Sequence, residues 1–301
     1  MKKKSFWNAD NDTCNIGKFF VQRIIDLEHV PFTVELVYPD ANLKEIKNLS
    51  QDIGLQHFSD NLLEILLSFH SFLIQTEKHN ILVDTCCGNN KERPTRQAWH
   101  QRNGPFLNNL TGSGVTAFDI DFVLCTHLHA DHVGWNTKLV DGKWVPTFPN
   151  AQYIFSQKEF EYWKTEDQKH PSEPIMYGSY NDSVLPVIKS GQALLVKSDY
   201  QIESGIELEP AYGHTPGNIV VNVESEGEQA ILCGDVIHHP LQLLRPMWST
   251  NFCHNPELSR QTRLNVLNRC ADTQTAILPA HFHSPSFGYI GRVGNTYHMI
   301  K

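Results

Sequence analysis

The sequence lacks the features that mark secreted, zinc-finger and membrane-spanning proteins. Its cysteines form no C-x-x-C pair and follow no regular spacing, which excludes a disulfide framework and a structural zinc finger. No apolar run approaches the about 20 residues of a membrane helix. The first twelve residues, MKKKSFWNADND, turn polar where a secretory leader would be apolar. We therefore expect a cytoplasmic protein in a reducing compartment, without a membrane partner.

Positive charge is also in short supply. The chain has 25 Lys and Arg residues against 33 Asp and Glu, which gives a net charge of −8. Nucleic-acid binding depends on clustered Lys and Arg that neutralise phosphates, so we expect no nucleic-acid partner. Histidine, in contrast, occurs 16 times. Imidazole is the commonest metal ligand in proteins, so the histidines are the residues to follow.

The chain contains no internal repeat, low-complexity segment or Gly/Ser/Pro-rich linker that would divide it. We therefore predict a single domain over residues 1–301, in which residues 1–60 are the hardest to place. A hydrophobic fraction of 40% is enough for one large core or two modest ones.

Short runs of β-branched and aromatic residues recur along the chain, most of them closed by Gly, Pro, Asn or Asp. They predict strands at 32–38, 71–76, 80–85, 121–126, 151–156, 193–197, 218–223, 229–235 and 275–281. Helices are predicted at 156–164, with Ser156 as N-cap, and at 255–270, where Asn255 can cap and Pro256 suits the first turn. Strands with helices interspersed across both halves indicate a layered α/β sandwich.

Seven polar side chains lie just past the end, or just before the start, of predicted strands. They are His127, His129, Asp131, His132, His214, Asp235 and His281. Strand ends are rigid enough to hold side chains to the tolerance that metal ligation demands. Any one of these histidines alone would more often be an ordinary surface residue, but the set favours a metal site. Five imidazoles and two carboxylates suit two borderline divalent cations, with Zn²⁺ as first choice.

The motif THLHADH, with downstream GHTPG, CGD and PAH, resembles the metallo-β-lactamase superfamily of metal-dependent hydrolases. The resemblance runs from ILVDT to PAHFHSP. It implies a four-layer αβ/βα sandwich, in which two mixed β-sheets are flanked by helices. It also implies that His127, His129 and His214 surround one metal, that Asp131, His132 and His281 hold a second, and that Asp235 bridges them. Asp84 would support the metal-binding loops from behind.

The chemistry implied by the resemblance is hydrolysis. Two cations about 3.5–4 Å apart bind a water, lower its pKa towards ~7 and polarise the electrophile. Asp131 is placed to carry a proton to the leaving group. The presence of Asp235 argues against class B β-lactamases, and His129 argues against flavodiiron proteins.

The remaining pattern is similar to the N-acyl-homoserine lactonase and organophosphate-hydrolase branch. Those lactonases commonly place a tyrosine three residues after the bridging aspartate, to contact the substrate carbonyl. Here that position is His238, whose imidazole can also donate a hydrogen bond. The apolar stretch 238–256, with 281–289 and Trp135, fits the wall of a pocket for a hydrophobic lactone or ester, unless Arg245 binds an anionic group. The packing of an outer helix layer fits equally well each bulky residue of 238–256 taken singly, namely Leu241, Leu244, Met247 and Trp248.

Several alternatives stay open at this stage. The same metals would serve a phosphotriester or phosphodiester, and a mononuclear iron persulfide dioxygenase shares most of these ligands. A non-catalytic, partner-binding member of the fold is disfavoured because its ligand set would be incomplete. The stretch 99–106 fits either a lid or a contact in a homodimer. Cys86 and Cys87 are expected to be buried thiols.

Overall fold

The structure is a computed structural model that describes residues 7–8 and 12–300. The basic residues 1–6, on which the leader argument partly depends, lie outside the described part. The chain divides into two compact units. Unit 1 comprises Met1–Gly17, Glu28–Ser68 and Gln201–Lys301, and unit 2 comprises Lys18–Leu27 and Phe69–Tyr200. Each unit has a hydrophobic core of its own, and a single domain over 1–301 stays a prediction.

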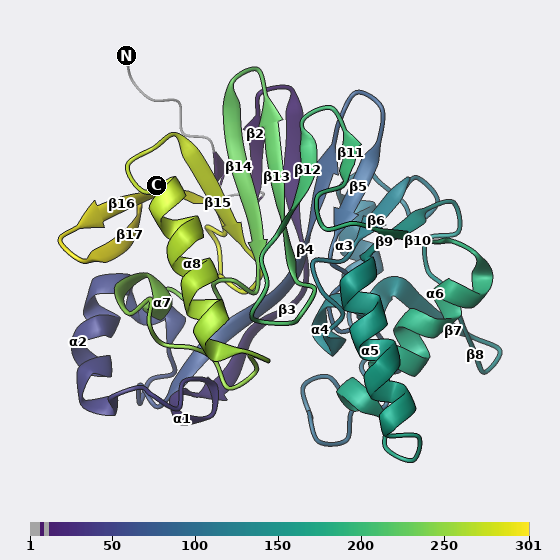
Figure 1. Ribbon diagram of the computed structural model, residues 1–301, viewed down its shortest axis with the longest axis horizontal. Coiled ribbons are helices and arrows are strands. Elements are labelled where there is room, and N and C mark those ends of the chain that lie inside the picture. The colour runs from purple at the N-terminus through teal and green to yellow at the C-terminus, as the bar shows by residue number, and fades with distance from the viewer. Residues whose placement is uncertain (1–6, 9–11, 301) are drawn as a thin grey trace. The chain divides into compact units, whose positions relative to one another are not determined.

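Unit 1 contains a seven-stranded sheet in the order β11-β12-β13-β14-β15-β16-β17 (Figure 1). Its pairs are antiparallel except for the parallel pair β14–β15. The strands are β11 (Gln201–Glu203), β12 (Ile206–Pro210), β13 (Ile219–Ser225), β14 (Glu228–Gly234), β15 (Thr275–Pro279), β16 (Gly288–Val293) and β17 (Thr296–Ile300). The helices of unit 1 are α1 (Val34–Val37), α2 (Leu43–Ile53), η1 (Leu55–His57), α7 (Leu241–Leu244) and α8 (Pro256–Cys270).

The second large sheet has the strand order β1-β2-β3-β4-β5-β6-β9-β10. It is also mixed, because β4–β5 is antiparallel whereas β5–β6, β6–β9 and β9–β10 are parallel. Its strands are β1 (Trp7–Asn8), β2 (Thr13–Ile16), β3 (Phe19–Thr33), β4 (Glu64–Gln75), β5 (Asn80–Val83), β6 (Phe122–Leu124), β9 (Gln152–Ser156) and β10 (Ala193–Val196). The long strands β3 and β4 have residues in both units.

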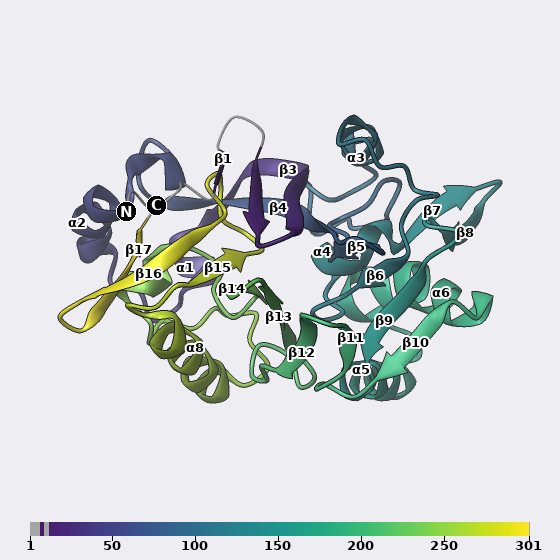
Figure 2. The same cartoon turned by 90° about the horizontal axis from the view of Figure 1, so that it is seen from above.

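The remaining elements of unit 2 are a hairpin and short helices. The hairpin pairs β7 (Thr137–Val140) with β8 (Lys143–Pro146). The helices are α3 (Phe106–Gly112), α4 (Ala130–Val133), η2 (Gly134–Asn136), α5 (Gln157–Lys169), η3 (Ile175–Gly178), η4 (Tyr180–Val184) and α6 (Leu185–Ser190). Figure 2 shows β9 and β10 side by side in this unit.

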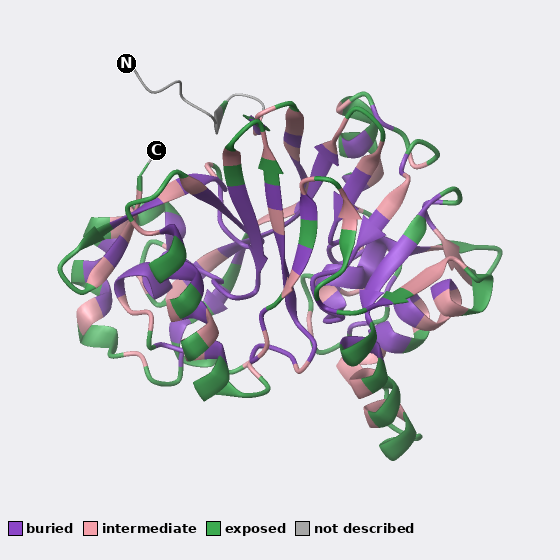
Figure 3. Ribbon diagram, turned by 45° about the horizontal axis from the view of Figure 1, so that its top comes forward, coloured by how far each residue is buried: buried purple, intermediate pink, exposed green. Residues whose placement is uncertain are grey.

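The central strands of both sheets are buried along most of their length (Figure 3). Parallel strands with both faces covered need continuous apolar runs, and β5 and β14 have them. Because β5 and β14 are packed in this way, the residues that directly follow them, Asp84 and Asp235, are attached to rigid strand ends.

Both predicted helices are present, and one predicted strand is wrong. α8 begins as expected, because the side chain of Asn255 accepts a hydrogen bond from the Leu258 N–H and Pro256 occupies the first turn. The segment 32–38 was expected to be a strand, but β3 ends at Thr33 and α1 follows. The hydroxyl of Thr33 accepts from the Leu36 N–H, so this N-cap overrides the β-branched pattern.

Unit 2 buries a lysine among polar groups. Lys91 is 0% exposed, and its Nζ donates to Thr137 Oγ1 (2.7 Å) and lies 3.5 Å from Asp182 Oδ1. Arg93 binds both oxygens of the same aspartate at 2.7 and 2.9 Å. Burial lowers the pKa of Lys91 to about 7, and Asp182 only partly opposes this shift. The ammonium of Lys91 and the guanidinium of Arg93 thus share the single carboxylate of Asp182.

We expect Lys91→Met to stabilise the protein at neutral pH, by about 1 kcal/mol or more. The pKa of Lys91 falls on folding, so protonated Lys91 costs stability in full below about pH 7. This cost fades as the pH rises towards the unfolded pKa of about 10.4. The advantage of the variant should therefore shrink between pH 7 and pH 10, as measured by urea unfolding at each pH. Lys189→Met, at an exposed lysine, is the control, and an advantage independent of pH would contradict the prediction.

Candidate metal centre

Four of the predicted ligands lie together in unit 2. β6 ends at Leu124, and the chain then turns into α4, which begins directly after His129. The ring of His127 lies 4.6 Å from that of His129 and 4.0 Å from that of His132, measured between centroids. Asp131 Oδ2 lies 3.8 Å from His132 Nε2. The three histidines are buried, and Asp131 is the more exposed member of the group.

Asp84 orients this group from the end of β5. It has a positive φ of 58°, and its carboxylate accepts hydrogen bonds from the Thr126 N–H (2.7 Å) and hydroxyl (2.8 Å). It also accepts from His132 Nδ1 at 2.8 Å. A neutral imidazole carries one N–H, so this bond directs the lone pair of His132 to Nε2, on the side of Asp131. The predicted supporting role of Asp84 agrees with these contacts.

The other three predicted ligands, and His238, lie together in unit 1. Asp235 directly follows β14, His214 precedes β13, and His281 follows β15. His214 Nε2 lies 3.1 Å from Asp235 Oδ2, and His281 Nε2 lies 3.0 Å from Asp235 Oδ1. His238 Nε2 is 3.1 Å from Asp235 Oδ2. Three imidazole nitrogens therefore converge on one buried carboxylate.

The second ring nitrogens of two of these histidines have partners that hold the rings in place. His281 Nδ1 contacts the carbonyl oxygen of Ser68 at 2.8 Å, and the Ser68 N–H donates back to the His281 carbonyl at 3.0 Å. His214 Nδ1 contacts Cys253 Sγ at 3.6 Å. Neither partner is predictable from the sequence, because Ser68 and Cys253 belong to none of the motifs that hold the predicted ligands.

The geometry of the unit 1 group suits a divalent cation. Two ligand atoms that each lie about 2.0–2.2 Å from a tetrahedral Zn²⁺ are about 3.3–3.6 Å apart, and slightly less in a distorted site. The separations of 3.0–3.1 Å from the Asp235 oxygens to the histidine nitrogens lie close to this range. Imidazole and carboxylate together are a donor set that Zn²⁺ and similar metals accept.

The pKa values of His214 and His238 are shifted in opposite directions. Burial lowers the pKa of His214, but Asp235 and, to a smaller extent, Cys253 together outweigh burial and raise it to about 10. The negative charge of Asp235 thus favours a positive charge on this side, which a bound cation would supply. Burial lowers the pKa of His238 to about 4 against the opposing effect of Asp235, so its imidazole is neutral at pH 7.

Several residues expected near a substrate have other positions. Trp135 belongs to the core of unit 2, where its ring stacks on Phe106 and its Nε1 donates to Asp26. Arg245 donates from Nε and Nη2 to Glu45 Oε2 at 3.0 and 2.8 Å, so its charge is already paired. In the 238–256 stretch, Leu241, Leu244 and Trp248 are buried while Met247 is 53% exposed.

Cys86 and Cys87 are buried, as expected, and burial raises the pKa of both thiols well above the usual value. Both thiols are therefore protonated at neutral pH, as buried structural cysteines are.

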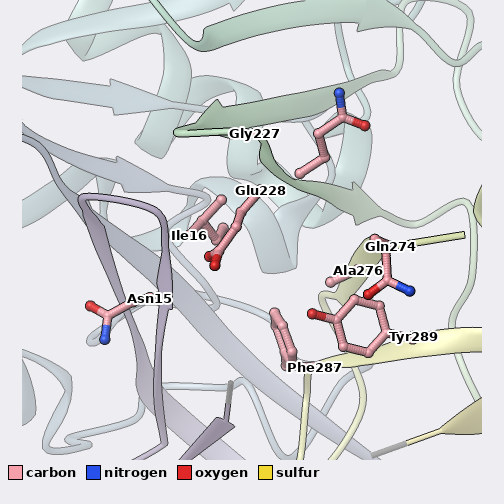
Figure 4. Close-up of a pocket in the computed structure, with 9 residues that line it drawn as sticks. Asn15, Ile16, Gly227, Glu228, Gln274, Ala276, Phe287 and Tyr289 are labelled. Carbon is pink, nitrogen blue, oxygen red and sulfur yellow. The ribbon is translucent and has the colours of Figure 1, made fainter. Parts of the chain in front are cut away.

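A cavity of about 210 Å³ lies elsewhere in unit 1, lined by residues of β2, β14, β15 and β16 and of the turns beside them (Figure 4). Glu228 contributes a carboxylate beside Phe287 and Tyr289, but its Oε2 already accepts the Gly17 N–H at 2.8 Å. One oxygen of that carboxylate therefore holds the turn at Gly17.

The comparison with known families decides the identity of the chain. The family model described as "Metallo-beta-lactamase superfamily" matches residues 68–289. The chain belongs to the metallo-beta-lactamase superfamily. The expected family is confirmed, and so is the α/β fold with two mixed sheets flanked by helices. The match also supports the expectation of a metal-dependent hydrolase.

Individual relatives of this superfamily member are distant. A curated N-acyl homoserine lactonase from Bacillus sp. is 24% identical over 176 residues, which is 54% of this chain and 60% of that protein. The chain thus aligns with only about 60% of the length of its curated relative.

Solved structures agree over more of the chain. The hydrolase AbOPH of the beta lactamase superfamily has a TM-score of 0.79 at 22% identity and 96% coverage of both chains. AidC, a dizinc quorum-quenching lactonase, has a TM-score of 0.75 at 21% identity, also with 96% coverage of both. A probable metal-dependent hydrolase from Staphylococcus aureus has a TM-score of 0.73 at 22% identity, over 89% of this chain and 90% of that one. At such identities the likeness is one of fold.

Among the described residues, no helix combines the length and the apolar character that crossing a membrane requires.

Proposed function

We propose that this protein is a dinuclear zinc hydrolase that opens a lactone, or cleaves an ester, of a fairly hydrophobic small molecule. One cation would be held by His127, His129 and His214, and a second by Asp131, His132 and His281. Asp235 would bridge them. The observation that carries the proposal is that each unit gathers its predicted ligands into one group, and that the family match over 68–289 contains both groups.

The cations, when bound, would supply hydroxide at neutral pH and polarise the carbonyl oxygen of the substrate. The protein's own groups perform the proton transfers. Asp131 takes the proton released as the nucleophilic oxygen bonds to the carbonyl carbon, and returns it to the alkoxide oxygen when the ring C–O bond breaks. Asp131 suits this role because it is less buried than the three histidines of its group. Neutral His238 can donate an N–H to the carbonyl oxygen.

A neutral lactone or ester as substrate is supported by two features. Arg245 is paired with Glu45, which disfavours its use in holding an anionic group. The curated relative and the structure of AidC are both named as lactonases. Phosphotriesters and phosphodiesters remain outcomes of the test below.

The proposal is tested by a pH-indicator screen of the purified, zinc-loaded protein. The substrates are acyl lactones of varied chain length, aryl esters and phosphotriesters, with metal-stripped protein as control. We expect metal-dependent turnover of lactones, with two metal ions per chain by mass spectrometry. One iron per chain, with oxygen uptake and sulfite release from a persulfide, would overturn the proposal in favour of a dioxygenase. Turnover by metal-stripped protein would contradict the mechanism.

His238→Phe tests the substrate contact. Phenylalanine keeps the ring but removes the N–H, so we expect kcat/KM for lactones to fall about 10–100-fold, or roughly 1.4–2.7 kcal/mol. Metal content should be unchanged if His238 contacts substrate and not a cation. His298→Phe on β17 serves as control. Unchanged lactone turnover in His238→Phe would show that the imidazole is no carbonyl donor.

A further inference from the structure

The partner of His214 on the side away from Asp235 is a sulfur atom. His214 Nε2 lies 3.1 Å from Asp235 Oδ2, and Nδ1 lies 3.6 Å from Cys253 Sγ. Metal-binding histidines almost always donate their second N–H to a carboxylate, a backbone carbonyl or water, and this donation sets the orientation of the ring. In this protein a cysteine occupies that position.

The backbone holds Cys253 against His214. The His254 N–H donates to the His214 carbonyl at 2.8 Å, and the Asn255 N–H donates to the Gly213 carbonyl at 2.9 Å. Gly213 permits this approach, since it has a φ of +129° and a Cβ there would lie 2.3 Å from the Ser259 nitrogen. The two segments are therefore locked side by side, and the position of the sulfur is not accidental.

Hydroxyl groups surround the sulfur on its other sides. Cys253 Sγ donates to Ser259 Oγ at 3.3 Å and contacts Thr250 Oγ1 at 3.3 Å. Ser259 is held in turn by Arg263, whose Nη2 donates to Ser259 Oγ at 3.2 Å. Because the S–H is directed at Ser259, the sulfur lone pairs remain to accept the Nδ1–H of His214.

We propose that Cys253 is a positioning residue for His214: its sulfur accepts the Nδ1–H and so makes Nε2 the nitrogen that binds the cation. An imidazole that binds a cation is neutral and keeps a single N–H, so a partner that accepts at Nδ1 leaves Nε2 as the nitrogen for the cation. The role depends on the proposed function, because it matters only if His214 is a metal ligand. It adds a residue that lies outside every motif in the sequence.

The test compares the Zn²⁺ affinity of Cys253→Ala, Cys253→Ser and the wild-type protein by chelator competition. We expect Cys253→Ala to bind one cation about 10-fold more weakly, at the lower end of the range for such partners because sulfur is a weak acceptor. Cys253→Ser should recover most of the loss, since a hydroxyl also accepts. Cys270→Ala, at a buried cysteine in α8 that makes no hydrogen bond to a predicted ligand within the described residues, should bind zinc as the wild type does. Cys253 itself is half-buried.

Three other outcomes would show that Cys253 does not position His214. Cys253→Ala with wild-type affinity would do so directly. If the metal-free Cys253→Ala protein melts well below the wild type and serine does not rescue binding, Cys253 merely supports the fold. A thiolate-to-cobalt charge-transfer band in the Co²⁺-loaded wild type, absent from Cys253→Ser, would make Cys253 a ligand instead. A wild-type protein that binds no metal would refute the proposed function itself, whereas the preceding outcomes leave that function intact.

Discussion

Asp235→Asn is expected to lower turnover at least about 10³-fold, which corresponds to roughly 4 kcal/mol of transition-state stabilisation. The carboxylate faces three histidine nitrogens, one of them from Oδ1 and two from Oδ2. An amide keeps one oxygen but loses the negative charge and the second donor atom. Two like-charged cations would then lose the anion that lies between them, so the bound metal should fall below two per chain.

The measurement is lactone turnover together with metal content by mass spectrometry. Asp60→Asn, at an exposed aspartate of the same unit, is the control and should match the wild type in both. The metal-free Asp235→Asn protein should remain folded, because the change removes a buried charge and is nearly isosteric. Full activity with full metal content in Asp235→Asn would refute the assigned ligand set.

Asp84→Asn is expected to weaken metal binding by about 100-fold and to reduce turnover accordingly. Asparagine tolerates the positive φ at this position, and its Oδ1 can still accept from the Thr126 N–H. Its NH₂ group, however, would meet His132 Nδ1 with a donor instead of an acceptor. The proton of the His132 imidazole would therefore move from Nδ1 to Nε2. This shift would remove the Nε2 lone pair that is proposed to bind the cation.

Chelator competition and thermal melting of the metal-free protein separate the effect on metal binding from an effect on folding. Asp141→Asn is a matched control, since Asp141 is exposed in unit 2 and also has a positive φ, of 48°. Zinc affinity equal to that of the wild type in Asp84→Asn would mean that the tautomer of His132 is not set by Asp84.

The sequence by itself determined the family and the fold class, and it supplied the predicted ligands. These properties follow from local order along the chain. Apolar runs predict strands, capping residues such as Asn255 predict where α8 begins, and THLHADH places four ligands within six residues. The strand predicted at 32–38 was wrong because two local signals compete there. The run is β-branched, which favours a strand, but the hydroxyl of Thr33 caps a helix.

Only the tertiary structure decided which atoms hold the ligands in place. His281 is paired with Ser68 across 213 residues, and His214 is paired with Cys253 across 39. Such partners meet because they are close in space, and a single hydrogen bond from an imidazole to a carbonyl oxygen or a sulfur leaves no periodic pattern in the sequence. Trp135 is a further example. A tryptophan at this position is compatible with a pocket wall, but its ring packs in the core of unit 2. Local pattern therefore predicts the ligands, whereas long-range contacts hold their rings in place.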